Sequence, residues 1–248
     1  MQKRLGVFGQ FVKQYEKARR PYKPEVYNFL KKFLSIKNPY ILDLGCGTGI
    51  STRPLASFSK VVGCDPDIRM LKAARKHKDA PVEKYVVGSA AKLPFKDASF
   101  DAVTAFSAFH WFDNKKDISE IKRVLKPGGI LFVANKTGLK SWGEGYRRAI
   151  IKTIKKEIAH FREDSYDPKK SLVKNGFKKI KVKRWKESET YTLPQALEYV
   201  QSVSIWSTAP ENLRDQAWLG VKKYFQNMKA RTGKIERKYV VRAVIGIK

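Results

Sequence analysis

Short apolar runs alternate with amphipathic stretches through the middle of the chain. The apolar runs have the length and composition of β-strands that are covered on both faces. They lie at residues 41–44, 61–62, 84–87, 102–106 and 130–134. Two stretches between them, from Asp67 to His77 and from Asp117 to Leu125, place their apolar residues at helical spacing. Because strands alternate with helices, the pattern predicts a parallel sheet with right-handed crossovers and with ligands at the carboxyl ends of the strands.

The last third of the chain has a different pattern. Residues 142–161 are typical of a long basic helix, and residues 178–185 alternate apolar residues with lysines as a half-exposed strand does. A further strand is predicted at 237–247. About fifty residues separate these two strands, whereas a hairpin loop takes roughly 2 to 5. The intervening stretch contains two helical patterns, at 193–205 and 211–228.

A glycine-rich turn follows the first predicted strand. Residues 42–49 read LDLGCGTG, and Asp65 ends the next apolar run about twenty residues later. Glycines let the chain turn tightly at the strand end and let a ligand lie against bare backbone. A carboxylate at this distance can accept hydrogen bonds from both hydroxyls of a ribose. The layout therefore predicts a site for a nucleoside ligand.

The spacing of the glycines separates two classes of ligand. A dinucleotide-binding turn needs glycine at its first, third and sixth positions, and the sixth position counted from Gly45 is the bulky Ile50. Glycines at 45, 47 and 49 with Asp43 ahead of them resemble instead motif I of the class I S-adenosylmethionine-dependent methyltransferases. The resemblance implies that S-adenosyl-L-methionine is the cofactor. It also implies that Asp43 orders the loop and helps to hold the methionine ammonium group.

Two further motifs extend this resemblance. LPFKDASFD at residues 93–101 is similar to the segment that leads into strand four of the methyltransferase type 11 subgroup, and RVLKPGG at 123–129 is similar to the turn before its strand five. The matching segments keep the family's order over residues 40–135. We therefore expect a Rossmann-like α/β fold with a seven-stranded, mostly parallel sheet, an antiparallel last strand, helices on both faces, and a helical insertion between strands six and seven.

The same reading predicts how the chain is organised. Residues 1–248 form a single methyltransferase domain, in which 1–38 are an N-terminal helical lid on the cofactor and 39–135 are the cofactor-binding core. Residues 186–236 are interpreted as a helical cap insertion over the acceptor site. The alternative is a structural layer that only widens the core.

The resemblance also implies which residues hold the cofactor. Ser89 stands where many relatives carry an acid that bonds the adenine amino group, so its hydroxyl is expected to accept there more weakly. Ala90 would offer its backbone N–H to the ring, and Pro66 would pack on the adenine face. The full expected set is Tyr15, Arg20, Asp43, Gly45, Gly47, Asp65, Pro66, Ser89, Ala90 and Phe106.

Two more segments point to one branch of the family. AFHWFD at residues 108–113 resembles the A-x-HWFD segment of methyltransferases similar to trans-aconitate methyltransferase, a branch that includes carboxylate O-methyltransferases of small molecules. YEKARRPYKP at 15–24 resembles the entry segment of that branch, although Lys23 interrupts the final Tyr-Pro pair. In relatives this entry segment folds over the cofactor, which is why Tyr15 and Arg20 are in the set.

His110 and Trp111 are the candidate catalytic residues. A carboxylate acceptor needs no deprotonation, whereas a phenol, amine or enol needs a base, and a histidine can act as that base or as a hydrogen-bond donor. Trp111 can present its indole N–H as a second donor. The alternatives are that His110 only bonds a neighbouring loop and that Trp111 is only a core residue.

The net charge of the chain leaves a second function open. The 52 basic and 23 acidic residues give +29, and residues 136–186 alone hold 17 basic against 5 acidic residues. Such a field attracts polyanions, and RNA is the obvious one. RNA-binding signatures and the active-site motifs of nucleic-acid methyltransferases are absent from the sequence. We therefore predict a small-molecule acceptor, with an RNA methyltransferase, a carbon methyltransferase of quinone biosynthesis and a binding protein without turnover as alternatives.

The cysteines, the histidines and the lengths of the apolar runs argue against a metal site, a disulfide scaffold and a membrane span. Two cysteines, Cys46 and Cys64, are too few for a disulfide scaffold or a four-cysteine zinc site, and the three histidines lie far apart, so we predict no metal. No run approaches the roughly 20 apolar residues of a membrane span. The apolar stretch at 5–8 is too short for a signal peptide, and a cytosolic protein is expected.

Overall fold

The computed structural model describes residues 9–77, 81–154, 166–207 and 209–248. The chain divides into two compact units. One unit, here called the sheet unit, comprises residues 20–135, 164–184 and 242–248. The other, here called the helical unit, comprises residues 1–19, 136–163 and 185–241.

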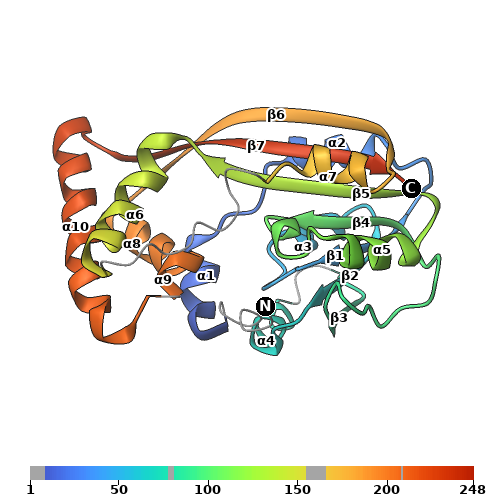
Figure 1. The fold of residues 1–248 in the computed structure, drawn as a ribbon, viewed down its shortest axis with the longest axis horizontal. Coiled ribbons are helices and arrows are strands. Elements are labelled where there is room, and N and C mark those ends of the chain that lie inside the picture. The colour runs from blue at the N-terminus through green and yellow to red at the C-terminus, as the bar shows by residue number, and fades with distance from the viewer. Residues whose placement is uncertain (1–8, 78–80, 155–165, 208) are drawn as a thin grey trace. The chain divides into compact units, whose positions relative to one another are not determined.

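Seven strands form one sheet in the order β3-β2-β1-β4-β5-β7-β6 (Figure 1). The strands are β1 (Tyr40–Leu44), β2 (Lys60–Asp65), β3 (Lys84–Val87), β4 (Phe100–Phe106), β5 (Leu125–Gly138), β6 (Lys178–Tyr191) and β7 (Ile235–Ile247). The pairs β3/β2, β2/β1, β1/β4 and β4/β5 are parallel. The carboxyl ends of β1, β2, β3 and β4 therefore lie at the same edge of the sheet, where a ligand site is expected.

The last strand runs against its neighbour. Lys248 N–H donates to Gly129 O at 2.9 Å, and Leu139 N–H donates to Lys238 O at 3.0 Å. Ten residues forward along β5 thus correspond to ten residues backward along β7, which is the register of an antiparallel pair. The mixed sheet and its antiparallel last strand confirm the expected fold.

Helices cover both faces of the sheet unit. They are α2 (Pro24–Lys31), α3 (Thr52–Leu55), α4 (Ile68–Ala74), α5 (Lys115–Val124) and α7 (Pro168–Lys174). Val103 and Ala105 of β4 belong to the core that includes α5 and α7. Phe106 faces the other way, with its ring 5.4 Å from that of Tyr27 in α2. This division follows from the alternation of side chains along a strand.

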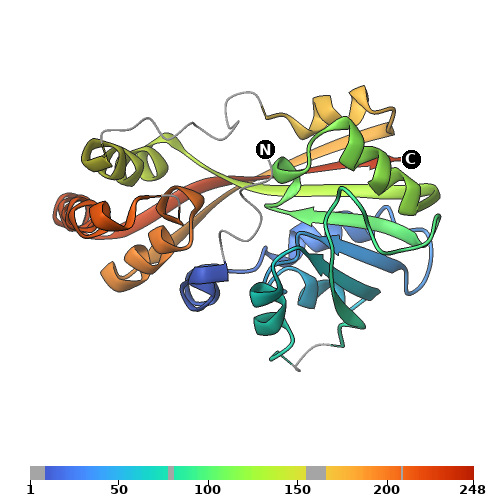
Figure 2. The same cartoon turned by 60° about the horizontal axis from the view of Figure 1, so that its bottom comes forward.

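The helical unit has its own apolar core. Its elements are a 3₁₀ turn at Gly9–Phe11, α1 (Val12–Ala18), α6 (Lys140–Ile154), α8 (Leu193–Gln201), α9 (Ser204–Ser207) and α10 (Glu211–Thr232). Helices α6, α8 and α10 lie side by side in both views (Figures 1 and 2). Phe225 and Val221 of α10 are fully buried in this core together with Ile150 of α6. The insertion between β6 and β7 is therefore helical, as expected, and its role as a cap over an acceptor stays a prediction.

Several element bounds differ from those expected. Strand β6 continues to Tyr191 instead of ending at Trp185, because the polar residues that follow are paired with β7 through Glu189. The helix expected at 193–205 ends at Gln201, where the Ser202 hydroxyl bonds Tyr199 O at 2.6 Å, and a separate short helix follows. The basic helix expected at 142–161 is seen as α6 up to Ile154, and the remainder of the expected range, 155–161, lies outside the described residues.

Arg123 connects the two motifs at 93–101 and 123–129. Its guanidinium donates to both carboxylate oxygens of Glu120 at 2.9 and 2.8 Å and to Asp97 at 2.7 Å. It also donates to the carbonyl oxygens of Phe95 and Leu93 at 2.9 and 3.2 Å. Such a planar fork of donors is a property of arginine that lysine lacks. Arg123 thus has a structural role in both motifs, because it holds the loop ahead of β4 in place.

Replacing Arg123 with methionine is expected to lower the free energy of unfolding by about 2 kcal/mol, since the change leaves part-buried carbonyls and Glu120 without their donor. Urea unfolding followed by circular dichroism measures the difference. Lys115→Met on the same helix is the control, because Lys115 is an exposed residue. Equal stabilities of the two variants would contradict the proposed structural role of Arg123.

Candidate functional site

The glycine turn after β1 has backbone conformations that only glycine adopts readily. Gly45, Gly47 and Gly49 have φ values of +71°, +55° and +76°. A Cβ atom on Gly45 would lie 2.6 Å from the Cβ of Ala108, and one on Gly49 would lie 2.4 Å from the Tyr85 hydroxyl. The turn therefore packs directly against the loop that follows β4.

Asp65 at the end of β2 is tied to this turn. One carboxylate oxygen accepts from Gly47 N–H at 2.9 Å, and the other accepts from Asp67 N–H at 2.9 Å. Burial raises the pKa of Asp65, while these two backbone donors act in the opposite direction. Each carboxylate oxygen retains lone pairs for a further donor. The carboxylate is thus oriented beside the glycine turn, as the sequence predicted for a ribose ligand.

Asp43 is buried inside the sheet unit, with 1% of its surface exposed. Its two oxygens accept from the hydroxyls of Thr52 at 2.6 Å and Thr104 at 2.8 Å. Burial raises the pKa of Asp43 to about 6, although the two hydroxyls act in the opposite direction. The contacts support a role in ordering the loop, and its expected contact with an ammonium group stays a proposal.

The raised pKa of Asp43 predicts a measurable pH dependence. The unfolded chain releases this proton near pH 4, whereas the folded chain holds it to about pH 6, so the contribution of Asp43 to stability falls as the pH rises across that window. The free energy of unfolding of Asp43→Asn minus that of the wild type should increase by roughly 2 kcal/mol between pH 4 and pH 7. Urea unfolding across this range measures it. The exposed Asp215→Asn serves as control and should give a flat difference; a flat difference for Asp43→Asn would rule out the raised pKa.

The loops after β2 and β3 lie side by side. Gly88 N–H donates to Asp65 O at 3.2 Å. Ser89 forms an isolated antiparallel bridge with Lys92, Ala90 is buried, and Pro66 is partly buried. The structure therefore brings three of the expected adenine contacts to the same edge as Asp65, and their contact with the cofactor stays a prediction.

His110 and Trp111 form a 3₁₀ turn after β4. Both side chains are partly buried, and their ring centroids lie 5.1 Å apart. Trp111 packs against the apolar core, whereas His110 meets Tyr166 edge to face at 5.9 Å. The Tyr166 hydroxyl accepts from Asn135 Nδ2 at 3.2 Å. His110 thus stands in a polar and aromatic setting at the carboxyl ends of β4 and β5.

The neighbouring Asp113 has a structural role. The hydroxyl of Ser171 in α7 donates to its carboxylate. Asn114 then caps α5 by accepting from Asp117 N–H at 3.0 Å. The end of the HWFD segment is therefore held by two helices, which leaves His110 and Trp111 as its candidates for chemistry.

Sequence reasoning missed the pairing of Tyr22 with Ser107. Their hydroxyl oxygens lie 2.6 Å apart, and Tyr22 also donates to Ala134 O at 3.1 Å. Ser107 has a positive φ of +54° at the end of β4, a strained conformation of the kind that often occurs at functional sites. Tyr22 follows the Arg-Pro pair in the motif at 15–24. The motif therefore includes Tyr22, but nothing in it indicates that Ser107 is the partner.

The other expected cofactor residues lie in different surroundings. Tyr15 belongs to α1 of the helical unit, where its ring lies 5.4 Å from the Arg19 guanidinium. Arg20 is an exposed residue of the sheet unit. Phe106 is buried, with its ring 5.1 Å from that of Tyr22. Contact of these three residues with the cofactor stays a prediction.

The two thiols and the described histidines form no metal-binding cluster. Cys46 and Cys64 are free and buried, and burial raises the pKa of both thiols. His77 is exposed near the end of α4, and His160 lies outside the described residues. In the described ranges, no three His, Cys, Asp or Glu side chains are placed to hold a metal ion. Nor does any helix in that part of the chain have the length and apolar character to cross a membrane.

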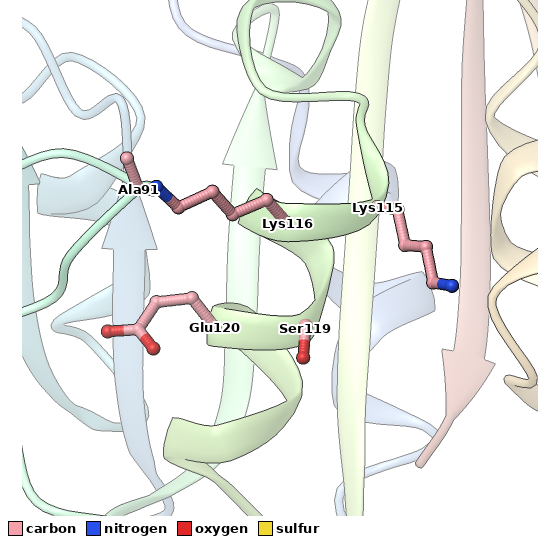
Figure 3. Close-up of a pocket in the computed structure, with 5 residues that line it drawn as sticks. All are labelled: Ala91, Lys115, Lys116, Ser119 and Glu120. Atoms are coloured by element: carbon pink, nitrogen blue, oxygen red, sulfur yellow. The ribbon is translucent and has the colours of Figure 1, made fainter.

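A shallow hollow lies on the surface of α5. It is lined by Ala91, Lys115, Lys116, Ser119 and Glu120 (Figure 3). Lys116 points toward Ala91, and Lys115 points away from it. The carboxylate of Glu120 is already bound by Arg123 and by Leu93 N–H at 2.8 Å. We assign this hollow no part in the chemistry.

The residues of the glycine turn fit S-adenosylmethionine. The turn offers bare backbone beside the oriented carboxylate of Asp65. Within the described residues, the buried hydroxyl of Thr48 in the same turn has no hydrogen-bond partner. A polar ligand that reaches this loop would supply one.

Comparisons with known proteins agree with this reading. A family model described as a methyltransferase domain matches residues 42–133. A methyltransferase-like protein of Schizosaccharomyces pombe is 30% identical over 222 residues, which cover 86% of this chain and 83% of that protein. A demethylmenaquinone methyltransferase of Corynebacterium kroppenstedtii is 45% identical over 95 residues, which cover 38% of this chain and 40% of that one.

The extent of these similarities varies. The chain spans about half the length of the mycobacterial methyltransferases that it matches, at 49% of their residues. The crystal structure of a methyltransferase from Anabaena variabilis has the same fold, with a TM-score of 0.65 and 19% identity over 94% of this chain and 99% of that chain. Together with the glycine turn and Asp65, these similarities show that the chain belongs to the class I S-adenosylmethionine-dependent methyltransferases, whose cofactor is S-adenosyl-L-methionine.

Proposed function

We propose that this protein transfers a methyl group from S-adenosylmethionine to a small organic molecule, at a carboxylate or hydroxyl oxygen. The observation that carries the proposal is the contact between the glycine turn and the loop after β4, where a Cβ on Gly45 would meet Ala108 at 2.6 Å. His110 follows Ala108 by two residues. This contact supports a site in which His110 and Trp111 lie close to the turn that is proposed to hold the cofactor.

The cofactor is proposed to be held by the carboxyl ends of the strands. Asp65 accepts from the ribose hydroxyls, and the bare backbone of Gly45 and Gly47 admits the ligand. Ser89, Ala90 and Pro66 contact the adenine. Asp43 orders the turn through Thr52 and Thr104.

The acceptor chemistry is assigned to His110 and Trp111. The bound sulfonium supplies an electrophilic methyl group, so the protein mainly has to align the acceptor oxygen and exclude water. His110 removes the proton of a hydroxyl acceptor, or donates an N–H to a carboxylate that needs no deprotonation. Trp111 offers its indole N–H as a second donor. Tyr166 packs edge to face on His110 and fixes its ring.

A carbon methyltransferase of quinone biosynthesis is a second candidate. The similarity to the demethylmenaquinone methyltransferase of Corynebacterium kroppenstedtii favours it, and that similarity covers 38% of this chain. The aligned part is short enough to consist of little more than a cofactor-binding core, so it supports the shared cofactor more than a shared acceptor.

The positive charge of β6 has a structural explanation that weakens the RNA alternative. Strand β6 is the last strand of the sheet order and is therefore an edge strand. Its lysines at 178, 179, 181 and 183 are exposed. Lysines on an edge strand prevent pairing with other chains. This part of the net charge thus needs no polyanion, and RNA methylation becomes an outcome of the test below.

Methyl-labelled S-adenosylmethionine tests the proposal. The purified protein is incubated with small-molecule metabolites and, separately, with total RNA from the source cells. We expect label in the metabolite fraction, on an oxygen atom of a product identified by mass spectrometry. Label on carbon of a quinone precursor would favour the second candidate, and label in RNA would overturn the small-molecule proposal. A cytosolic location, expected from the sequence, stays a prediction that fractionation of those cells checks.

A further inference from the structure

The helical unit contains a cluster of partly or fully buried charged and aromatic side chains that the proposed chemistry does not use. Its members are Arg19, Lys136, Tyr146, Arg147, Glu187, Glu189, Tyr191, Tyr199, Arg237 and Tyr239. They come from the C-terminal cap of α1, from α6 and α8, and from the adjoining parts of β5, β6 and β7. Charged side chains are rarely buried without a partner, so the charge balance of this cluster is informative.

Glu189 contacts four other members of the cluster, Lys136, Tyr191, Arg237 and Tyr239. Its carboxylate lies 3.3 Å from Lys136 Nζ and 3.3 Å from Arg237 Nη1, and it accepts from Tyr239 at 2.8 Å. Burial acts to raise the pKa of Glu189, but Lys136, the hydroxyls of Tyr191 and Tyr239, and Arg237 together lower it to about 2. This one ionised carboxylate therefore forms ion pairs with two cations, Lys136 and Arg237.

Arg19 has no acid to compensate its charge within the described residues. Its Nε donates to the Ser202 hydroxyl, and its Nη2 donates to Ser202 O, both at 3.0 Å. Its guanidinium carbon lies 4.8 Å from the centre of the Tyr199 ring. These contacts position the guanidinium but leave its positive charge without a partner.

Arg237 is placed on the same tyrosine. Its guanidinium carbon lies 4.7 Å from the centre of the Tyr199 ring, and only 4% of the residue is exposed. In the described residues its single hydrogen bond runs from Nη1 to Glu189. An arginine carries five N–H donors, so most of those of Arg237 are available. Arg19 and Arg237 both contact the ring of Tyr199, so their like charges repel each other.

We propose that Arg19 and Arg237 together form a site against Tyr199 that binds the carboxylate of a small organic molecule. A bound carboxylate would accept from the free guanidinium donors of both arginines and would remove their mutual repulsion. The surrounding tyrosines favour a small organic carboxylate with an apolar or aromatic body over a hydrated inorganic ion.

Binding of simple carboxylates tests the site. The probes are succinate and benzoate, and their uncharged analogues succinamide and benzamide are the controls, all compared by calorimetry at the same ionic strength. The wild type should bind at least one carboxylate and neither amide. Arg19→Gln should weaken that binding at least tenfold, since it removes the charge without leaving an acid unpaired. Lys17→Gln, which removes an exposed cation from the same helix, should bind like the wild type.

Two results would overturn the carboxylate site. One is equal binding of the carboxylates and their amides by the wild type, or binding of neither. The other is an Arg19→Gln variant that binds the carboxylate as tightly as the wild type. S-adenosylhomocysteine binding, measured on the same samples, separates this inference from the proposed function. A wild type that binds S-adenosylhomocysteine but no carboxylate rejects the anion site alone, whereas failure to bind S-adenosylhomocysteine rejects the proposed function.

Discussion

Replacing Asp65 with alanine is expected to abolish cofactor binding while leaving the chain folded. The carboxylate is proposed to accept from two ribose hydroxyls, and it also holds Gly47 N–H at 2.9 Å, so its loss removes ligand contacts and loosens the turn together. Hydrogen bonds to a charged group contribute about 1.5–3 kcal/mol each, which for two of them predicts at least a 100-fold weaker affinity. Calorimetry with S-adenosylhomocysteine measures it.

Two further variants make this result interpretable. Asp65→Asn keeps one acceptor oxygen and should bind with intermediate affinity. Asp215→Asn changes an exposed acid on α10 and should bind like the wild type. The circular dichroism spectrum of Asp65→Ala should match that of the wild type, because the carboxylate lies at the end of β2 and not within the apolar core. Wild-type affinity in Asp65→Ala would show that the ribose is held elsewhere.

Replacing His110 with alanine is expected to reduce turnover by roughly 100-fold and to leave S-adenosylhomocysteine affinity unchanged. The reason is that His110 is assigned to the acceptor oxygen and not to the cofactor. If the acceptor is a hydroxyl, the fall in rate toward acid pH that a catalytic base produces should disappear in the variant. Steady-state kinetics against pH, with the acceptor found by the labelling experiment, measures both effects.

His77→Ala is the matched control for this variant. His77 is exposed near the end of α4, and its replacement should leave kcat and KM as they are in the wild type. A His110→Ala variant with unchanged turnover would mean that the imidazole only packs against Tyr166 and Trp111. Reduced cofactor affinity in that variant would instead assign His110 to the cofactor site.

Much of the fold could be predicted because the patterns that indicate its strands and helices involve residues close together in the chain. The apolar run at 84–87 predicts a strand, and Asp67 directly ahead of a helical pattern predicts the N-terminal cap of α4. The glycine turn and Asp65 were likewise readable, since the left-handed conformation of the turn requires glycine wherever it occurs. Where polar residues form a strand, as at the end of β6, the local pattern failed because distant partners satisfy them.

The sequence by itself determined the alternation of strands and helices, the glycine turn, the acid that follows it and the His-Trp pair, because each depends on residues close together in the chain. Only the tertiary structure decided the partners of Asp43, the pairing of Tyr22 with Ser107 and the placing of two arginines on Tyr199. Tyr22 and Ser107 are 85 residues apart, and Thr104 lies 61 residues from Asp43. Such pairs depend on which strand ends and helices the fold brings together, and no local period or propensity carries that information.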